Sequence, residues 1–299
     1  MHYLSYAVVL GGAVCAILGG WAYFRRYQVS RPPIGVFTLQ DLALMVLFII
    51  LVPFLYLILP AWFVAALLLL AALSILYFTW EPLLHAHWAT WLAMCALLAA
   101  DLGTAFLLGM RSNGFFAVND AVLVVIVVGI SNLWAQSGMK ARDAALLGAF
   151  LTIYDVLATS QLPLTSTLFA HLAGLPLAPL LSWGSGRSAL GIGLGDLLLA
   201  TVFPLVLRKA FGRSAGITAM VLALGAIGTM LLLPLRGVFP VMVVLGPLIV
   251  LQYLFWRRYR GQERTTWQYL QEEPLHHCGQ QLPPTGLAKV GILEDSFLE

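Results

Sequence analysis

Residues 141–160 read ARDAALLGAFLTIYDVLATS and place a carboxylate, Asp155, inside a run that is otherwise apolar enough to cross a membrane. About 20 mostly apolar residues span the hydrocarbon core of a bilayer as a helix. A carboxylate at the centre of such a helix costs about 2.5–3.5 kcal/mol on insertion scales. A second acid, Asp196, lies in another apolar run at GIGLGDLLLA, residues 191–200. Two such unfavourable placements indicate a function for the pair.

The composition indicates an integral membrane protein. The chain has 299 residues, of which 61% are hydrophobic and 10% charged, and a soluble core cannot hide that much apolar surface. The formal charge of +3 resides in short loops between apolar runs, so we expect no nucleic-acid partner. The cysteines Cys15, Cys95 and Cys278 have no pairing or metal-site spacing. We therefore expect neither a disulfide framework nor a metal or other cofactor.

Apolar runs of spanning length occur nine times, which predicts an all-α, polytopic membrane protein. The first run is expected to be a retained helix, because its basic pair follows the apolar stretch instead of preceding it. The predicted spans are residues 3–24, 39–59, 61–80, 88–110, 115–136, 141–162, 189–209, 215–233 and 238–256. Residues 1–256 thus form the predicted transmembrane domain.

The basic residues predict the orientation of these spans. Short cytoplasmic loops carry an excess of Lys and Arg. Alternate connections hold nearly all of the basic residues, whereas the opposite connections carry only Arg111, Arg187 and Arg236. We therefore expect an N-terminus outside the cell and a cytoplasmic C-terminus. The basic residues on the expected cytoplasmic side are Arg25, Arg26, Arg31, Lys140, Arg142, Arg208, Lys209, Arg213, Arg257, Arg258, Arg260 and Arg264.

The composition changes after Trp256, where QERTTWQYLQEEPLHHCGQQLPP begins at Gln262. This polar stretch predicts a flexible or loosely docked cytoplasmic tail over residues 257–299. Three neighbouring side chains, His276, His277 and Cys278, are of metal-binding type, but adjacent residues cannot surround one ion without further ligands. A solvated tail is the favoured interpretation.

Asp155 and Asp196 belong to consecutive predicted spans and meet at similar depth if those helices are neighbours. Two close carboxylates do not both ionise readily, so they share one proton. One acid can then activate water while the other protonates or polarises a peptide carbonyl. The glycines Gly191, Gly193 and Gly195 predict that the second span starts partly unwound, where an extended substrate can pair as an added strand.

These residues resemble a known family. Tyr154-Asp155 and Gly193-Leu194-Gly195-Asp196 are similar to the YD and GxGD motifs of the presenilin and signal peptide peptidase family of intramembrane aspartyl proteases. That family also has a Pro-Ala-Leu motif at the entrance of its ninth span. Here Pro240-Val241-Met242 stands at that position, with Val and Met replacing Ala and Leu. The resemblance covers the nine-span layout and is sharpest from Tyr154 to Pro247.

The resemblance implies a presenilin-like bundle of nine helices that hydrolyses peptide bonds within the membrane. The outside N-terminus is similar to the signal peptide peptidase branch, so we expect transmembrane peptides or remnant signal peptides as substrates and membrane lipid as the surroundings. A prokaryotic plasma membrane is the expected location, and the oligomeric state stays open. The implied catalytic residues are Asp155 and Asp196, and the implied substrate-binding residues are Tyr154, Gly193, Leu194, Gly195, Pro240, Val241 and Met242.

Other interpretations stay open from the sequence. A proton- or ion-coupled transporter can use the same two acids as a relay. A prepilin-peptidase-like enzyme also uses a glycine-flanked Asp, although the YD motif and the ninth-span proline fit that family less well. Asp101 and Asp120 form a rival pair, for which we favour a structural or hydration role. The long apolar connection from Gln161 to Ser188 is expected to gate substrate access.

Overall fold

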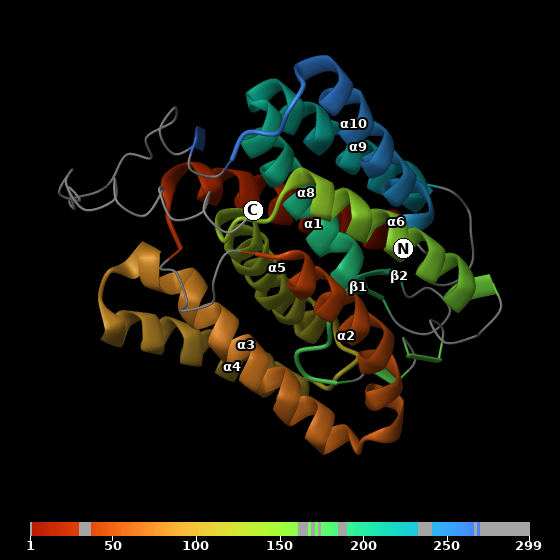
Figure 1. The fold of residues 1–299 in the computed structure, drawn as a ribbon. Helices are drawn as coiled ribbons and strands as arrows, with labels where there is room; N and C mark the ends of the chain where they lie inside the picture. The colour runs from red at the N-terminus through yellow and green to blue at the C-terminus, as the bar shows by residue number, and fades with distance from the viewer. Residues whose placement is uncertain are drawn as a thin grey trace.

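The computed structural model describes residues 2–29, 37–160, 167–168, 171–172, 175–184, 190–232, 241–265 and 268–269. Over these residues the chain is all-helical apart from one pair of short strands (Figure 1). The elements are α1 (His2–Arg26), α2 (Leu39–Ile58), α3 (Ala61–Leu84), α4 (His87–Leu107), α5 (Asn113–Gln136), α6 (Ala141–Ser160), β1 (Leu180–Trp183), β2 (Leu190–Gly193), α8 (Leu194–Phe211), α9 (Arg213–Leu232) and α10 (Met242–Arg260).

Six of these helices, α1 to α5 and α9, are long and apolar enough to cross a membrane. They fit an integral membrane protein. The other three, α6, α8 and α10, carry more charge: α6 includes Asp155, α8 includes Asp196, and α10 ends in arginines. The count of nine spans therefore stays a prediction for these three helices.

Helix boundaries agree with the sequence prediction except near the glycine-rich and proline-containing segments. The predicted break near Pro60 is confirmed, because α2 ends at Ile58 and α3 begins at Ala61. The run predicted to begin a helix at residue 189 instead starts as strand β2, and α8 begins only at Leu194. The last helix begins at Met242 and continues to Arg260, beyond the predicted end at residue 256.

Helix α8 lies at the centre of the molecule, surrounded by other helices (Figure 1). Its residues are buried almost continuously from Leu197 to Phe211, and it packs against α1, α5, α6, α9 and α10. The α3–α4 pair lies to one side and packs against α5. Because α8 is buried on all sides, it needs no polar face, and a largely apolar run can form it.

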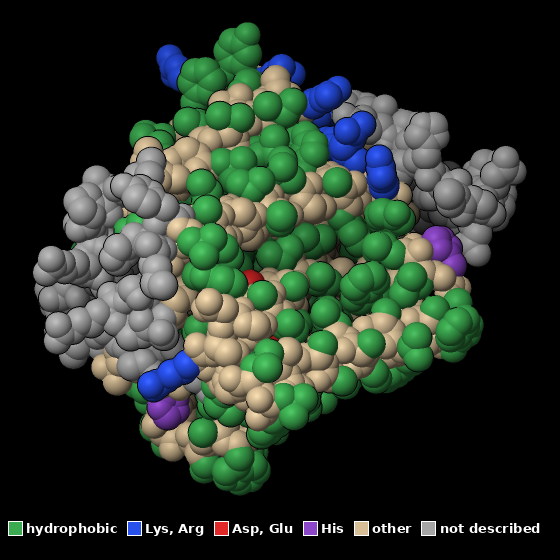
Figure 2. Space-filling view, turned by 180° about the vertical axis from the view of Figure 1, so that it is seen from behind, with side chains coloured by type: hydrophobic (Ala, Val, Ile, Leu, Met, Phe, Trp, Pro, Cys, Tyr) green, Lys and Arg blue, Asp and Glu red, His purple; other side chains and the backbone are tan. Residues whose placement is uncertain are grey.

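The outer surface is largely hydrophobic, as Figure 2 shows for one face. Large apolar side chains such as Phe48, Leu92 and Phe255 are exposed on α2, α4 and α10. A soluble monomer rarely exposes so much contiguous apolar surface. Lys and Arg side chains gather along one edge in the same view. A lipid-facing belt with a basic end accounts for this pattern.

Candidate active site

The two predicted catalytic acids meet at one cavity. A cavity of about 480 Å³ lies between α2, α6, α8 and the strand pair, and both Asp155 and Asp196 line it. Helices α6 and α8 are in contact, and the charge of Asp155 acts directly on the Asp196 carboxyl. The lining also includes Tyr154, Gly193, Leu194 and Gly195, and is otherwise mainly apolar. The structure thus brings together six of the nine predicted site residues.

Asp196 lies in the first turn of α8, directly after the glycine-rich strand β2. Gly193 is the N-cap residue of this helix, and its backbone is extended, with φ of −67° and ψ of 149°. A carboxylate in the first turn interacts favourably with the helix dipole. A Cβ atom at Gly193 would lie 3.8 Å from Asp196 Oδ2, so the glycine leaves the acid open on that side.

Asp155 shares one face of α6 with Leu147, Leu151 and Tyr154, all of which line the cavity. The spacing of these residues is that of a single helix face. Leu147 and Leu151 were not predicted as site residues. Their helical spacing from Asp155 is the signal in the sequence that identifies them.

The wall opposite α8 is formed by α2, for which the sequence carries no comparable signal. Only Leu42 of α2 is buried, so the helix packs loosely against the rest of the protein. Pro53 lies inside α2 and also lines the cavity. Proline removes a backbone hydrogen bond within a helix and favours a kink there. The residues contributed by α2 are Met45, Phe48, Ile49, Val52, Pro53 and Tyr56.

Small residues hold α10 against α6 beside Asp155. Thr152 Oγ1 donates to Gly148 O at 2.8 Å and lies 3.2 Å from Met242 O on α10. A Cβ atom at Gly246 would collide with Thr152 Oγ1 and would lie 2.7 Å from Gly148 O. This close approach places the Met242 backbone in polar contact with the Asp155 carboxylate. Small residues that allow helix backbones to approach closely are typical of helix pairs in membranes.

We expect Gly246→Ala to destabilise the α6–α10 contact by about 1–3 kcal/mol, because overpacking forces backbone shifts. Thermal unfolding in detergent measures the change. Gly225→Ala on α9 is the matched control, since a Cβ atom at Gly225 meets nothing within 4 Å. Equal unfolding temperatures for the two variants would show that the α6–α10 contact tolerates the extra methyl group.

The two described residues of the predicted ninth-span motif, Val241 and Met242, do not line the cavity. They are 2% and 0% exposed. The Met242 backbone lies near the Asp155 carboxyl, and the side chains of both residues are buried away from a substrate in this cavity. Pro240 lies outside the described residues.

Among the described residues, one edge of the strand pair has no backbone partner, and this edge borders the cavity. β1 and β2 are antiparallel, with Leu181 opposite Ile192, and Leu194 N donates to Pro179 O at 3.0 Å. Backbone groups alternate in direction along a strand, so those of Gly191 and Gly193 point away from β1. Both glycines line the cavity. The predicted unwinding before Asp196 is confirmed. The edge of β2 that no described strand pairs with borders the same cavity as the two acids.

The outer edge of β1 is covered by polar side chains of α5. Asp120 Oδ1 accepts a hydrogen bond from Ser182 N at 2.9 Å, and Asn119 Nδ2 donates to Ala178 O and Leu180 O at 3.3 and 3.4 Å. These contacts fix the position of β1 against the helices. Because buried polar side chains occupy this edge, β1 cannot accept a further strand there.

Asp101 on α4 holds the chain just before β1. Its Oδ2 atom accepts from Leu177 N at 3.0 Å, and Leu177 has a left-handed backbone with φ of 57°. This conformation is unfavourable for leucine and persists where surrounding contacts determine it. Asp101 and Asp120 therefore both bind the backbone of the connection between α6 and α8, in agreement with the favoured structural role.

Within the described part of the chain, His, Cys, Asp and Glu side chains form no group of three suited to hold a metal ion. The tail residues His276, His277 and Cys278 lie outside that part, as does half of the expected gating connection. Leu168 and Leu172 of that connection do line the cavity.

Fold and site together define a membrane-embedded bundle in which two acids on separate helices face one apolar cavity. Comparisons of the chain with protein-family models, curated proteins and solved structures find no match.

Proposed function

We propose that this protein is an intramembrane aspartyl protease of the presenilin and signal peptide peptidase kind. One observation carries the proposal: Asp155 and Asp196, on separate helices of a membrane bundle, line the same cavity and interact electrostatically. Buried acids in membrane proteins are functional by default, because their placement is unfavourable. The extended glycine-rich strand β2 beside Asp196 provides a backbone edge on which an unwound peptide can bind.

In the proposed reaction the two carboxyls share one proton and hold a water molecule between them. The ionised acid takes a proton from the water as its oxygen attacks the substrate carbonyl carbon, and the protonated acid donates to the carbonyl oxygen. A proton then passes to the amide nitrogen as the C–N bond breaks. The products are a carboxylic acid and an amine, and no cofactor takes part.

The substrate is proposed to bind as a third strand on the edge of β2. Gly191 and Gly193 line the cavity, and no described strand pairs with their outward backbone N–H and C=O groups. Strand addition is a common mode of peptide recognition. A transmembrane helix must unwind locally to bind in this way. Loosely packed α2 is the wall through which such a helix reaches the acids from the lipid.

The proposed topology has nine spans, with α6, α8 and α10 added to the six apolar helices. The arginines at the end of α10 face the cytoplasm in this arrangement, and the N-terminus lies outside a prokaryotic plasma membrane. Transmembrane segments and remnant signal peptides are the proposed substrates.

Mass spectrometry of purified protein reconstituted in lipid with a transmembrane peptide tests the proposal. We expect new peptide ends that lie within the hydrophobic segment of the substrate. A proton-coupled transporter would instead give solute flux that depends on a pH gradient, without new peptide ends. Flux without cleavage would refute the protease proposal.

A further inference from the structure

The chain turns back against the bundle after α10. Gly261 has a left-handed φ of 83°, which lets the chain reverse direction at the end of the helix. Arg264 N then donates to Ala210 O at 3.2 Å, and its Nη2 atom donates to Arg208 O at 3.2 Å. The start of the tail is therefore docked, where the sequence left a flexible and a loosely docked segment as alternatives.

Tyr269 anchors this returning segment at α1. Its ring stacks on Phe24 with the centroids 5.7 Å apart, and its side chain is 2% exposed. Thr265 and Gln268 form reciprocal hydrogen bonds at 2.8 and 3.2 Å between them. The segment is thus held at both of its ends.

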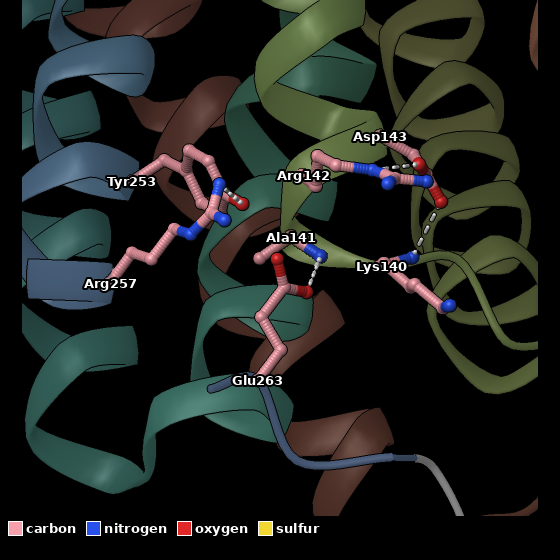
Figure 3. Close-up of polar contacts among 7 residues, drawn as sticks. All are labelled: Lys140, Ala141, Arg142, Asp143, Tyr253, Arg257 and Glu263. Carbon is pink, nitrogen blue, oxygen red and sulfur yellow. Dashed lines mark hydrogen bonds and ion pairs between the residues drawn. The ribbon is translucent and has the colours of Figure 1, made fainter. Parts of the chain in front are cut away.

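Glu263 is the only carboxylate among the described residues of this segment. It lies near the start of α6 and the ends of α8 and α10 (Figure 3). Its Oε2 atom accepts a hydrogen bond from Ala141 N, the first amide of α6, at 3.1 Å. It follows the last residue of α10 by three positions, and the neighbouring Arg264 binds the end of α8 through its backbone N–H. Its charge attracts the buried ammonium group of Lys209 on α8. Glu263 thereby joins α6, α8 and α10.

Lys209 extends the connection to a fourth helix. Its Nζ atom donates to Ala135 O at 2.7 Å and to Met139 O at 2.8 Å, at the end of α5. The side chain is 3% exposed. A buried ammonium group requires compensation, and the charges of Glu263 and Asp143 both act on Lys209.

The helices joined at Glu263 are the ones that carry the site. At a rise of about 1.5 Å per residue, Asp155 lies about 21 Å along α6 from Ala141, and Asp196 lies about 20 Å along α8 from Lys209. Met242, which contacts Asp155, lies about 17 Å along α10 from Tyr253 on the same scale. Both acids and their supporting backbone thus sit at similar distances from this junction.

We propose that Glu263 is a positioning residue that sets the spacing of α6, α8 and α10 from the end opposite the acids. This inference rests on the proposed function. The returning segment acts as a clasp: when Glu263 is in place, the carboxyls of Asp155 and Asp196 share the cavity at reactive distance. A displacement of about 1 Å at a reacting centre can lower the rate by about 100-fold.

The experiment combines a distance measurement with kinetics on the full chain. Spin labels at Leu146 of α6 and Leu254 of α10, which are exposed and lie outside the cavity, report helix separation after the native cysteines are replaced. The variants are Glu263→Ala, and Glu263→Gln, which keeps the hydrogen-bond acceptor but removes the charge. Arg258→Gln, at an exposed position near the same end, is the charge-change control.

We expect Glu263→Ala to broaden and lengthen the distance distribution and to lower kcat about tenfold with little change in KM, because ground-state binding is unaffected. Glu263→Gln should give smaller changes of the same kind and Arg258→Gln none. An unchanged distribution in both Glu263 variants would overturn the proposal whatever the rate. If Glu263→Ala does not fold, the Gln variant decides in the same way.

The distance measurement also separates this inference from the proposed function. Broadening in the Glu263 variants of a protein that cleaves no peptide would support the clasp and refute the protease.

Discussion

Replacing either Asp155 or Asp196 with asparagine is expected to lower the rate of peptide cleavage by at least about 10³-fold, because an amide can neither take up nor share the catalytic proton. The shapes of the side chains barely change, so folding should persist. Cleavage of a reconstituted transmembrane peptide measures the effect, and size-exclusion chromatography with circular dichroism checks the fold.

The double variant sharpens this expectation. Groups that act as one unit show non-additive losses, so Asp155→Asn combined with Asp196→Asn should be no slower than either single variant. Asp101→Asn is the matched control, because asparagine retains an oxygen that can accept from Leu177 N. We expect it to cleave at close to the unmodified rate. Full cleavage by either Asp155→Asn or Asp196→Asn would disprove the catalytic assignment.

Gly193→Pro is expected to lower kcat/KM by about 10- to 100-fold, the consequence of leaving one substrate carbonyl without its hydrogen bond. Proline suits this position because Gly193 has φ of −67° and follows an extended residue. The substitution removes the N–H group at the free edge of β2 and leaves the bonds to β1 intact. Steady-state cleavage of a peptide series measures the loss.

Gly193→Ala separates the lost hydrogen bond from the added side chain. Alanine keeps the N–H group, and its Cβ atom would make ordinary contact with Asp196 Oδ2 at 3.8 Å. Its loss of activity should therefore be much smaller than that of the proline variant. Equal losses would refute substrate binding as an added strand.

The sequence predicted the helices well because apolar runs of spanning length are a strong signal. It also located both acids, since a carboxylate in such a run is conspicuous. The strand pair was harder to predict, because two short segments, Leu180–Trp183 and Leu190–Gly193, gain their pairing from tertiary contacts with Asn119 and Asp120. Sequence spacing suggested unwinding but not the second strand.

Other parts of the site had no signal at all. The residues of α2 that line the cavity are indistinguishable from lipid-facing ones, because both are uniformly apolar. Met242 was predicted from a motif to contact substrate, yet packing through Gly148, Thr152 and Gly246 buries it behind Asp155. Glu263 was overlooked because polar composition after Trp256 predicted a solvated tail, and composition does not reveal docking.

Asn119 and Asp120 close one side of the strand pair, and this gives the enzyme proposed here a way of choosing its targets. Of the two described strands, β2 is the one whose outer edge no described side chain or strand covers, and the groups at that edge belong to the main chain of Gly191 and Gly193. Main-chain pairing does not distinguish one side chain from another. We therefore expect substrates to be selected by how easily their transmembrane helices unwind, and not by a particular sequence.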